Sequence, residues 1–156
     1  MKKILFVCLG NICRSPQAEA IFNHKIKEKR LAQVYQGDSC GTSNYHIGCI
    51  PDHRTIQNSL KNGVPIYHAA RQLTDQDLVN FDLILAMDES NYDNILSLPS
   101  APANHHKIKL MREFDPQGCG DVPDPYYGTE QDFQEVFDIL NRSVENLIVT
   151  ISQNNN

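Results

Sequence analysis

The stretch VCLGNICRSP, residues 7–16, spaces a cysteine and an arginine in a way that suits phosphoryl chemistry. Cys8 is followed by five residues and then by Arg14 and Ser15. The planar guanidinium of Arg14 can hold two oxygens of a phosphate or a similar oxyanion. A thiolate beneath a bound phosphoryl group is placed for in-line attack on phosphorus. The spacing therefore predicts a loop that binds an oxyanion above the sulfur of Cys8.

The flanking residues indicate how such a loop is held. KKILFVCLG is a short apolar run ending in glycine, typical of a strand buried on both faces of a parallel sheet. Ser15 and Pro16 predict a helix that begins with Ser15 as its N-cap and runs to about Arg30. A strand, a glycine-containing loop and a helix N-terminus direct several backbone N–H groups toward one anion. This setting favours the thiolate form of Cys8 near neutral pH.

The rest of the chain alternates strands and helices. Further strands are expected over 32–41, 81–88 and 106–114, and further helices over 54–62, after Thr74, from about Glu89 and from Thr129. This order predicts an α/β fold with a doubly wound, four-stranded parallel sheet flanked by helices and the phosphate-binding loop after the first strand. One domain is expected over residues 1–152, followed by a disordered tail over 153–156.

Composition narrows the classes of function. The net charge of −5 disfavours a surface that binds nucleic acid or an anionic membrane, and no apolar run approaches the length of a membrane span. The five cysteines are an odd number without a C-x-x-C pair, which disfavours both a disulfide scaffold and a zinc ribbon. We expect a cytoplasmic protein without a bound metal, either a monomer or a weak dimer.

Two motifs and the segment between them resemble the low-molecular-weight protein tyrosine phosphatase family. They are VCLGNICRSP, FDLILAMDESN and DPYY at 124–127, and the resemblance extends to about Ile151. It implies hydrolysis of phosphotyrosine in proteins, and of small aryl phosphates, through a phosphocysteine intermediate without metal or organic cofactor. Cys8 would be the nucleophile and Arg14 the phosphate clamp. Asp124 would protonate the leaving phenolate and then activate water, whereas nearby Asp121 does not match the motif. Inorganic phosphate and other oxyanions are expected as product or inhibitors.

The resemblance also assigns supporting roles. The phosphate-binding loop would comprise Leu9, Gly10, Asn11, Ile12, Cys13 and Ser15. Asparagine tolerates the left-handed backbone that such a loop needs, and Ser15 can hydrogen-bond the thiolate as well as cap the helix. His68 would support Asn11 from beneath, although a histidine there can equally be an ordinary core residue.

The substrate cleft would be formed by Ile12, Tyr45, Asp88, Tyr126 and Tyr127. Asp88 has an alternative role as the cap of the helix that begins at Glu89, and the tyrosines can be ordinary loop aromatics. In the family a second cysteine forms a reversible disulfide with the nucleophile, which here is Cys13. Its alternative is a small buried apolar side chain.

Three other functions remain open at this point. An arsenate reductase uses a similar loop but needs further cysteines to relay a disulfide, and Cys119 has no close partner in the sequence. A phosphoarginine phosphatase tends to carry threonine at the position of Ile12. A phosphate-binding or redox-sensing module without turnover would have little reason to retain Asp124.

Overall fold

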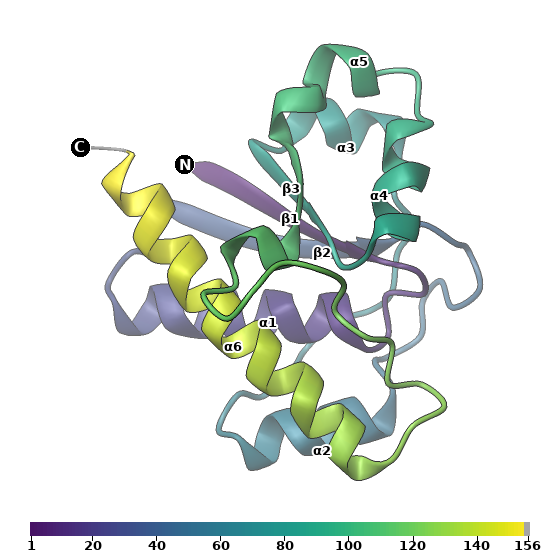
Figure 1. The fold of residues 1–156 in the computed structure, drawn as a ribbon, viewed down its shortest axis with the longest axis vertical. Helices are drawn as coiled ribbons and strands as arrows, with labels where there is room; N and C mark the ends of the chain where they lie inside the picture. The colour runs from purple at the N-terminus through teal and green to yellow at the C-terminus, as the bar shows by residue number, and fades with distance from the viewer. Residues whose placement is uncertain (155–156) are drawn as a thin grey trace.

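A four-stranded parallel sheet forms the centre of the computed structural model, which describes residues 1–154 (Figure 1). Its strands are β1 (Lys2–Cys8), β2 (Tyr35–Gly41), β3 (Leu83–Ala86) and β4 (Ile108–Leu110), in the spatial order β2-β1-β3-β4. The helices are α1 (Arg14–Glu28), α2 (His53–Lys61), α3 (Asp75–Asn80), α4 (Glu89–Leu96), α5 (Ala101–Asn104) and α6 (Glu130–Gln153), with the 3₁₀ helices η1 (His105–Lys107) and η2 (Met111–Phe114). The predicted fold class is confirmed.

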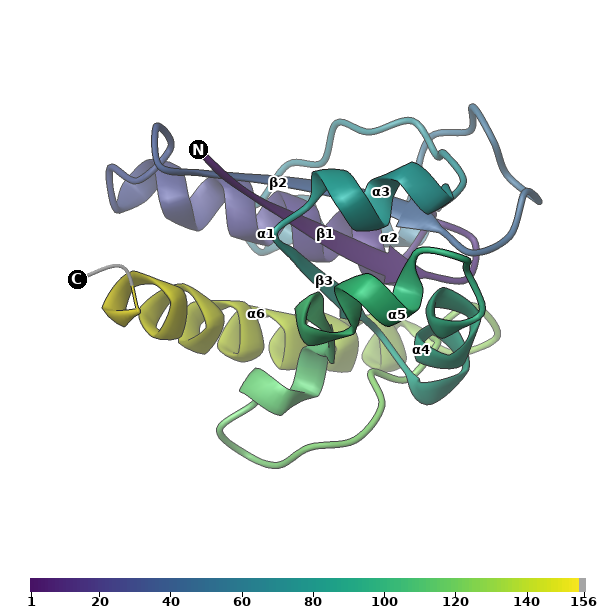
Figure 2. The ribbon, with the colours of Figure 1, turned by 90° about the horizontal axis from the view of Figure 1, so that it is seen from above.

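Helices cover both faces of this sheet. Figure 1 shows α1, α2 and α6 on one side and α3, α4 and α5 on the other, and Figure 2 shows the same arrangement from above. Side chains of β1 alternate between the two resulting cores: Phe6 packs with α1 and α6, whereas Leu5 and Val7 pack with α3 and α4. Because β1 is buried on both faces, its sequence is a continuous apolar run.

The C-terminal helix α6 has the amphipathic face expected from its sequence. Its buried apolar residues are Phe133, Val136, Phe137, Ile139, Leu140, Val144, Leu147 and Ile148. Thr129 precedes the helix and forms a capping box with Asp132, whose carboxylate accepts from the Thr129 N–H at 2.6 Å. The helix ends at Gln153, one residue into the expected tail, and residues 155–156 lie outside the described part of the chain.

The fourth strand is shorter than the sequence indicated. Strand pairing stops at Leu110, and residues from Met111 to Phe114 turn into η2. The Leu110 N–H donates to Glu113 Oε2 at 2.6 Å, which satisfies it locally instead of in the sheet. The short helix α5 was not anticipated from the sequence. Within the described residues no helix has both the length and the apolar character needed to cross a membrane.

A buried carboxylate joins η2 to α6. The enclosed side chain of Asp115 accepts from Arg112 Nε at 2.9 Å and from Arg142 Nε and Nη2 at 2.8 and 3.1 Å. Burial by itself raises the pKa of the Asp115 carboxyl, but the bonds from Arg142, Gln117 N–H and Arg112 outweigh burial and lower that pKa below its ordinary value.

This lowered pKa predicts a specific pH dependence of stability. A carboxyl whose pKa is lower in the folded chain contributes stability that is present above about pH 4 and lost as pH falls through the folded value. We expect Asp115→Asn to lower the free energy of unfolding by about 1–3 kcal/mol at neutral pH. The difference from wild type should shrink below about pH 4. Urea unfolding across pH measures both, and a difference that stays constant into acid would contradict the prediction.

Candidate active site

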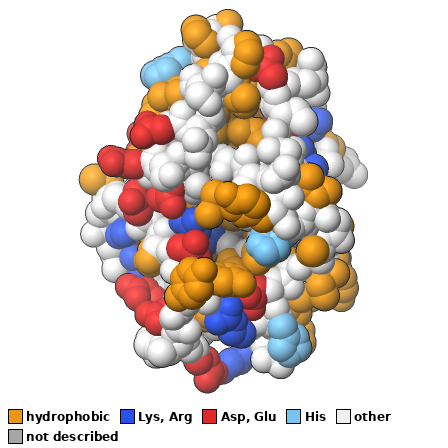
Figure 3. All heavy atoms as spheres, turned by 90° about the vertical axis from the view of Figure 1, so that its right-hand side faces the viewer, with side chains coloured by type: hydrophobic (Ala, Val, Ile, Leu, Met, Phe, Trp, Pro, Cys, Tyr) orange, Lys and Arg blue, Asp and Glu red, His pale blue; other side chains and the backbone are white. Residues whose placement is uncertain are grey.

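A cavity of about 250 Å³ lies at the carboxyl ends of the central strands. Figure 3 shows a hollow on this side of the molecule, bordered by apolar side chains and a histidine. The cavity is lined by Cys8, Leu9, Gly10, Ile12, Cys13, Arg14, Tyr45, His46, Asp124, Tyr126 and Tyr127. The structure therefore brings together two motifs that are far apart in the sequence, the loop after β1 and the DPYY segment before α6.

The loop between β1 and α1 curls around the sulfur of Cys8. The N–H of Asn11 points at Cys8 Sγ from 3.3 Å, and Ser15 Oγ lies 2.9 Å from the same sulfur. Asn11 has φ of +57°, in the left-handed region that asparagine tolerates better than most residues. These contacts fix the position of the sulfur inside the loop.

The expected N-cap role of Ser15 is wrong. The helix α1 begins at Arg14, its N-cap is Cys13, and no side chain caps it. The Ser15 hydroxyl instead lies by Cys8 Sγ and accepts from Asn11 Nδ2 at 2.8 Å. Pro16 is tolerated because it remains in the first turn, where the N–H groups have no intrahelical partner. The uncapped N-terminus leaves this turn's N–H groups free to meet an anion.

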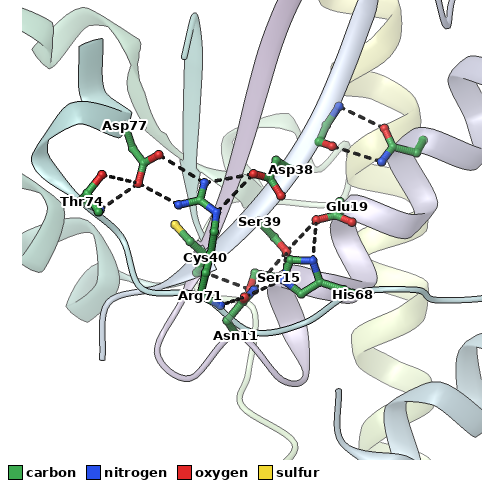
Figure 4. Close-up of polar contacts among 12 residues, drawn as sticks. Asn11, Ser15, Glu19, Asp38, Ser39, Cys40, His68, Arg71, Thr74 and Asp77 are labelled. Carbon is green, nitrogen blue, oxygen red and sulfur yellow. Dashed lines mark hydrogen bonds and ion pairs between the residues drawn. The ribbon is translucent and has the colours of Figure 1, made fainter. Parts of the chain in front are cut away.

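The side chain of Asn11 lies beneath the loop in a network of buried polar groups (Figure 4). Its Nδ2 donates to Ser15 Oγ and to Ser39 Oγ, and its Oδ1 accepts from His68 Nε2 at 2.7 Å and from the Arg71 N–H at 3.1 Å. All four hydrogen-bonding positions of this carboxamide are thereby satisfied.

A second layer of contacts holds this network. Ser39 Oγ donates to Glu19 Oε1 at 2.9 Å, and His68 Nδ1 lies 3.2 Å from the same oxygen. Glu19, His68 and Asp38 present ligand-type atoms within 4.8 Å of one another, a spacing that a metal ion can use. Each of the three already has a protein partner: Glu19 accepts from Ser39, His68 donates to Asn11, and Asp38 accepts from Arg71. This occupied donor set favours a structural hydrogen-bond network over a metal site.

Arg14 is fixed at one end of its guanidinium. Its Nη1 donates to Asp88 Oδ2 at 2.7 Å and to the Val122 carbonyl at 2.9 Å, while Nη2 lies 3.7 Å from Asp124 Oδ2. Burial alone would lower the pKa of Arg14, but Cys8 and Asp88 raise that pKa above its ordinary value. The guanidinium is therefore held cationic over the loop.

The structure separates the three aspartates near this site. Asp124 lines the cavity and has a half-exposed side chain. Asp88 is not among the residues that line it. It caps α4 through the Asn91 N–H, the alternative role expected from the sequence, and it also holds Arg14. Asp121 also lies off the cavity and accepts from the Glu89 N–H at 3.0 Å.

Aromatic side chains form the wall of the cavity. Tyr126 and Tyr127 meet edge to face at 4.9 Å between ring centroids, and Tyr45, which also lines the cavity, is largely exposed. Sequence reasoning missed His46, which lines the cavity, and Arg54, whose guanidinium lies 5.4 Å from the Tyr126 ring centroid. No sequence signal marked them, because His46 reaches the cavity, and Arg54 the Tyr126 ring, only through the tertiary fold.

The two cysteines of the loop differ in environment. Both are buried, free and line the cavity. Burial raises the pKa of Cys13 to about 12, although a hydrogen bond with Thr55 opposes the change. Cys13 is therefore a neutral thiol at physiological pH. The exposed Cys49 and Cys119 do not line the cavity.

The parallel α/β sheet carries, after its first strand, a loop that holds the Cys8 sulfur next to a fixed arginine. This combination of fold and site is that of a phosphatase. Residues 3–156 match the family model "Low molecular weight phosphotyrosine protein phosphatase". The human low-molecular-weight phosphotyrosine protein phosphatase is 42% identical over 137 residues, 87% of each chain. The chain therefore belongs to the low-molecular-weight phosphotyrosine protein phosphatase family.

Solved structures give the same result. A protein tyrosine phosphatase from Entamoeba histolytica superposes with a TM-score of 0.95 at 40% identity, covering 100% of both chains. The YwlE arginine phosphatase of Bacillus subtilis superposes with a TM-score of 0.86 at 25% identity, covering 96% of this chain and 95% of that one. The fold is thus shared by enzymes with different substrates, so the substrate must be argued from the site.

Proposed function

We propose that this chain hydrolyses phosphotyrosine in proteins, and small aryl phosphates, through a phosphocysteine intermediate on Cys8. The observation that carries the proposal is the shared cavity of Cys8, Arg14 and Asp124, walled by Tyr126. The aromatic wall suits the phenyl ring of a phosphotyrosine. Ile12 at the rim offers no hydroxyl to a guanidinium, which favours an aryl phosphate over phosphoarginine.

The reaction proceeds in two displacements. The loop N–H groups and Arg14 bind the three phosphoryl oxygens and stabilise their charge as it redistributes. The Cys8 thiolate attacks phosphorus while the bond to the phenolic oxygen breaks, and the Asp124 carboxyl donates its proton to that oxygen. Water then attacks phosphorus and gives a proton to Asp124, the P–S bond breaks, and phosphate leaves. No step requires a metal or organic cofactor.

The proposal extends to the organisation of the protein. Residues 1–152 would act as one phosphatase domain, because the two hydrophobic cores share a single sheet. We place the protein in the cytoplasm as a monomer or weak dimer that acts on phosphotyrosine-containing proteins. Inorganic phosphate and related oxyanions would bind the same loop as product or inhibitors.

The decisive experiment replaces the nucleophile. We expect wild type to hydrolyse phenyl phosphate at about pH 6 with EDTA present, and Cys8→Ser to lose at least about a thousandfold in kcat. Cys49→Ser removes an exposed thiol outside the cavity and should retain full activity. If folded, reduced wild type has no turnover but reduces arsenate with added thiol, the arsenate reductase alternative replaces the proposal.

The general acid is tested by a matched pair of aspartates. Asp124→Asn should lower kcat for phenyl phosphate by about a hundredfold or more. The loss should be smaller for p-nitrophenyl phosphate, because that leaving group needs its proton less. Asp121→Asn keeps an oxygen for the Glu89 N–H and should stay within about threefold of wild type. Equal losses for both substrates would show that Asp124 is not the acid.

We propose that Cys13 protects the nucleophile from oxidation. Peroxide would convert the Cys8 thiolate to a sulfenic acid, and the Cys13 sulfur would displace its oxygen as water to form a disulfide. Dithiothreitol should then restore the activity of peroxide-treated wild type, whereas Cys13→Ala should be inactivated irreversibly. Peptide mapping follows the same samples. Finding wild-type Cys8 only as sulfinic or sulfonic acid would contradict this role.

A further inference from the structure

The segment 68–73, which comes after α2 in the chain, lies beneath the phosphate-binding loop and pairs with the end of β2. The Arg71 carbonyl accepts from the Gly41 N–H at 2.9 Å, and the Leu73 N–H donates to the Gly41 carbonyl at 2.7 Å. From this position, the backbone N–H of Arg71 and the ring of His68 both donate to Asn11 Oδ1. The location of this segment therefore sets the location of the Asn11 side chain.

One guanidinium anchors the segment to two other elements (Figure 4). Arg71 Nη2 donates to Asp38 Oδ2 on β2 at 3.0 Å, and Arg71 Nη1 donates to Asp77 Oδ2 on α3 at 3.0 Å. Two further bonds, from Nε to Asp38 at 3.3 Å and from Nη2 to Asp77 at 3.2 Å, complete a fork on each side. Asp77 also accepts from the Thr74 N–H, so the same carboxylate closes the start of α3.

The surroundings of Arg71 keep its guanidinium positively charged. Burial lowers the pKa of Arg71, but the bond to Asp77 and the charges of Cys40 and Asp38 raise that pKa well above its ordinary value. Its side chain is about one-third exposed. On one edge of the guanidinium two N–H groups meet both oxygens of Asp77, and on the other two N–H groups meet a single oxygen of Asp38. An ion pair at a partly exposed site contributes little to stability, so this arrangement points to a role in fixing geometry.

Asn11 is the residue through which this geometry reaches the sulfur. Its left-handed backbone aims its N–H at Cys8 Sγ, and its amide nitrogen holds Ser15 Oγ, which lies by the same sulfur. A non-glycine residue persists in this conformation when its surroundings over-determine it. The bonds from Arg71 and His68 are the ones that fix the carbonyl end of its side chain.

We propose that Arg71 is a positioning residue for the reaction: its double fork holds segment 68–73 so that Asn11 keeps Cys8 and Ser15 in their reactive arrangement. This role rests on the proposed function of Cys8. Arg71 does not line the cavity and has no contact with the reacting atoms. Lysine at this position retains the charge but has no planar fork, so Arg71→Lys tests the geometry with the local field preserved.

The experiment compares Arg71→Lys with wild type in two measurements. We expect kcat for phenyl phosphate to fall about tenfold, with KM changed less than about threefold, because Asn11 no longer holds the sulfur in place. The rate of Cys8 alkylation by iodoacetamide at about pH 6 should fall as well. Peptide mapping follows Cys8, and the exposed Cys49 in the same digest reports any general change in reactivity.

A double-mutant cycle decides whether Arg71 acts through Asn11. In an Asn11→Ala background, Arg71→Lys should cause no further loss of kcat or of Cys8 alkylation. Asp38→Asn loosens one side of the fork, leaves the cap of α3 in place and should show the same losses in smaller degree. Ile148→Val removes a methylene from the core at the far end of α6 and should lower Tm without either loss.

Two results would overturn the proposal. One is that Arg71→Lys and Asp38→Asn lower Tm as Ile148→Val does but leave kcat and Cys8 alkylation unchanged. The other is full additivity of Arg71→Lys with Asn11→Ala. If wild type lacks turnover, the function proposed for Cys8 fails, and the alkylation rates still decide the role of Arg71, because alkylation requires no turnover.

Discussion

The carboxamide of Asn11 is buried without exposed surface, so each of its hydrogen bonds must be met inside the protein. The groups that meet them come from α1, from β2 and from the segment after α2. Because these elements converge on one side chain, they hold the loop above it in a conformation that is left-handed at Asn11. That conformation aims the Asn11 N–H at Cys8, so the site's chemistry depends on a polar interaction below the cavity.

A second set of contacts, around the guanidinium of Arg14, holds the opposite side of the site. Val122 is bonded to the end of β3, because its N–H donates to the carbonyl of Met87, the residue after that strand, at 2.8 Å. Its own carbonyl accepts from Arg14. Asp88 contacts the same guanidinium while it caps α4. The segment that carries Asp124 is thus attached to the sheet next to Arg14. Asp124 and Arg14 are thus placed by the ends of the same two strands, β1 and β3.

Close packing beneath the loop leaves no room for a side chain at Gly41, the last residue of β2. A side chain at Gly41 would place its Cβ 2.7 Å from the Leu9 carbonyl oxygen and 3.1 Å from the Asn11 nitrogen. Both are backbone atoms, which cannot move aside without distorting the loop. The end of β2 therefore approaches the loop as closely as backbone allows, and the same residue pairs with segment 68–73.

The sequence by itself determined the alternation of strands and helices, the amphipathic α6 and the loop after β1, because these depend on local periodicity and spacing. The family resemblance added Asp124. Tertiary structure alone decided that Ser15 does not cap α1, that Asp88 holds Arg14, that the Val122 carbonyl accepts from Arg14, and that the Arg71 N–H donates to Asn11. These roles rest on backbone groups and on contacts between residues distant in the chain, which no local pattern of side chains records.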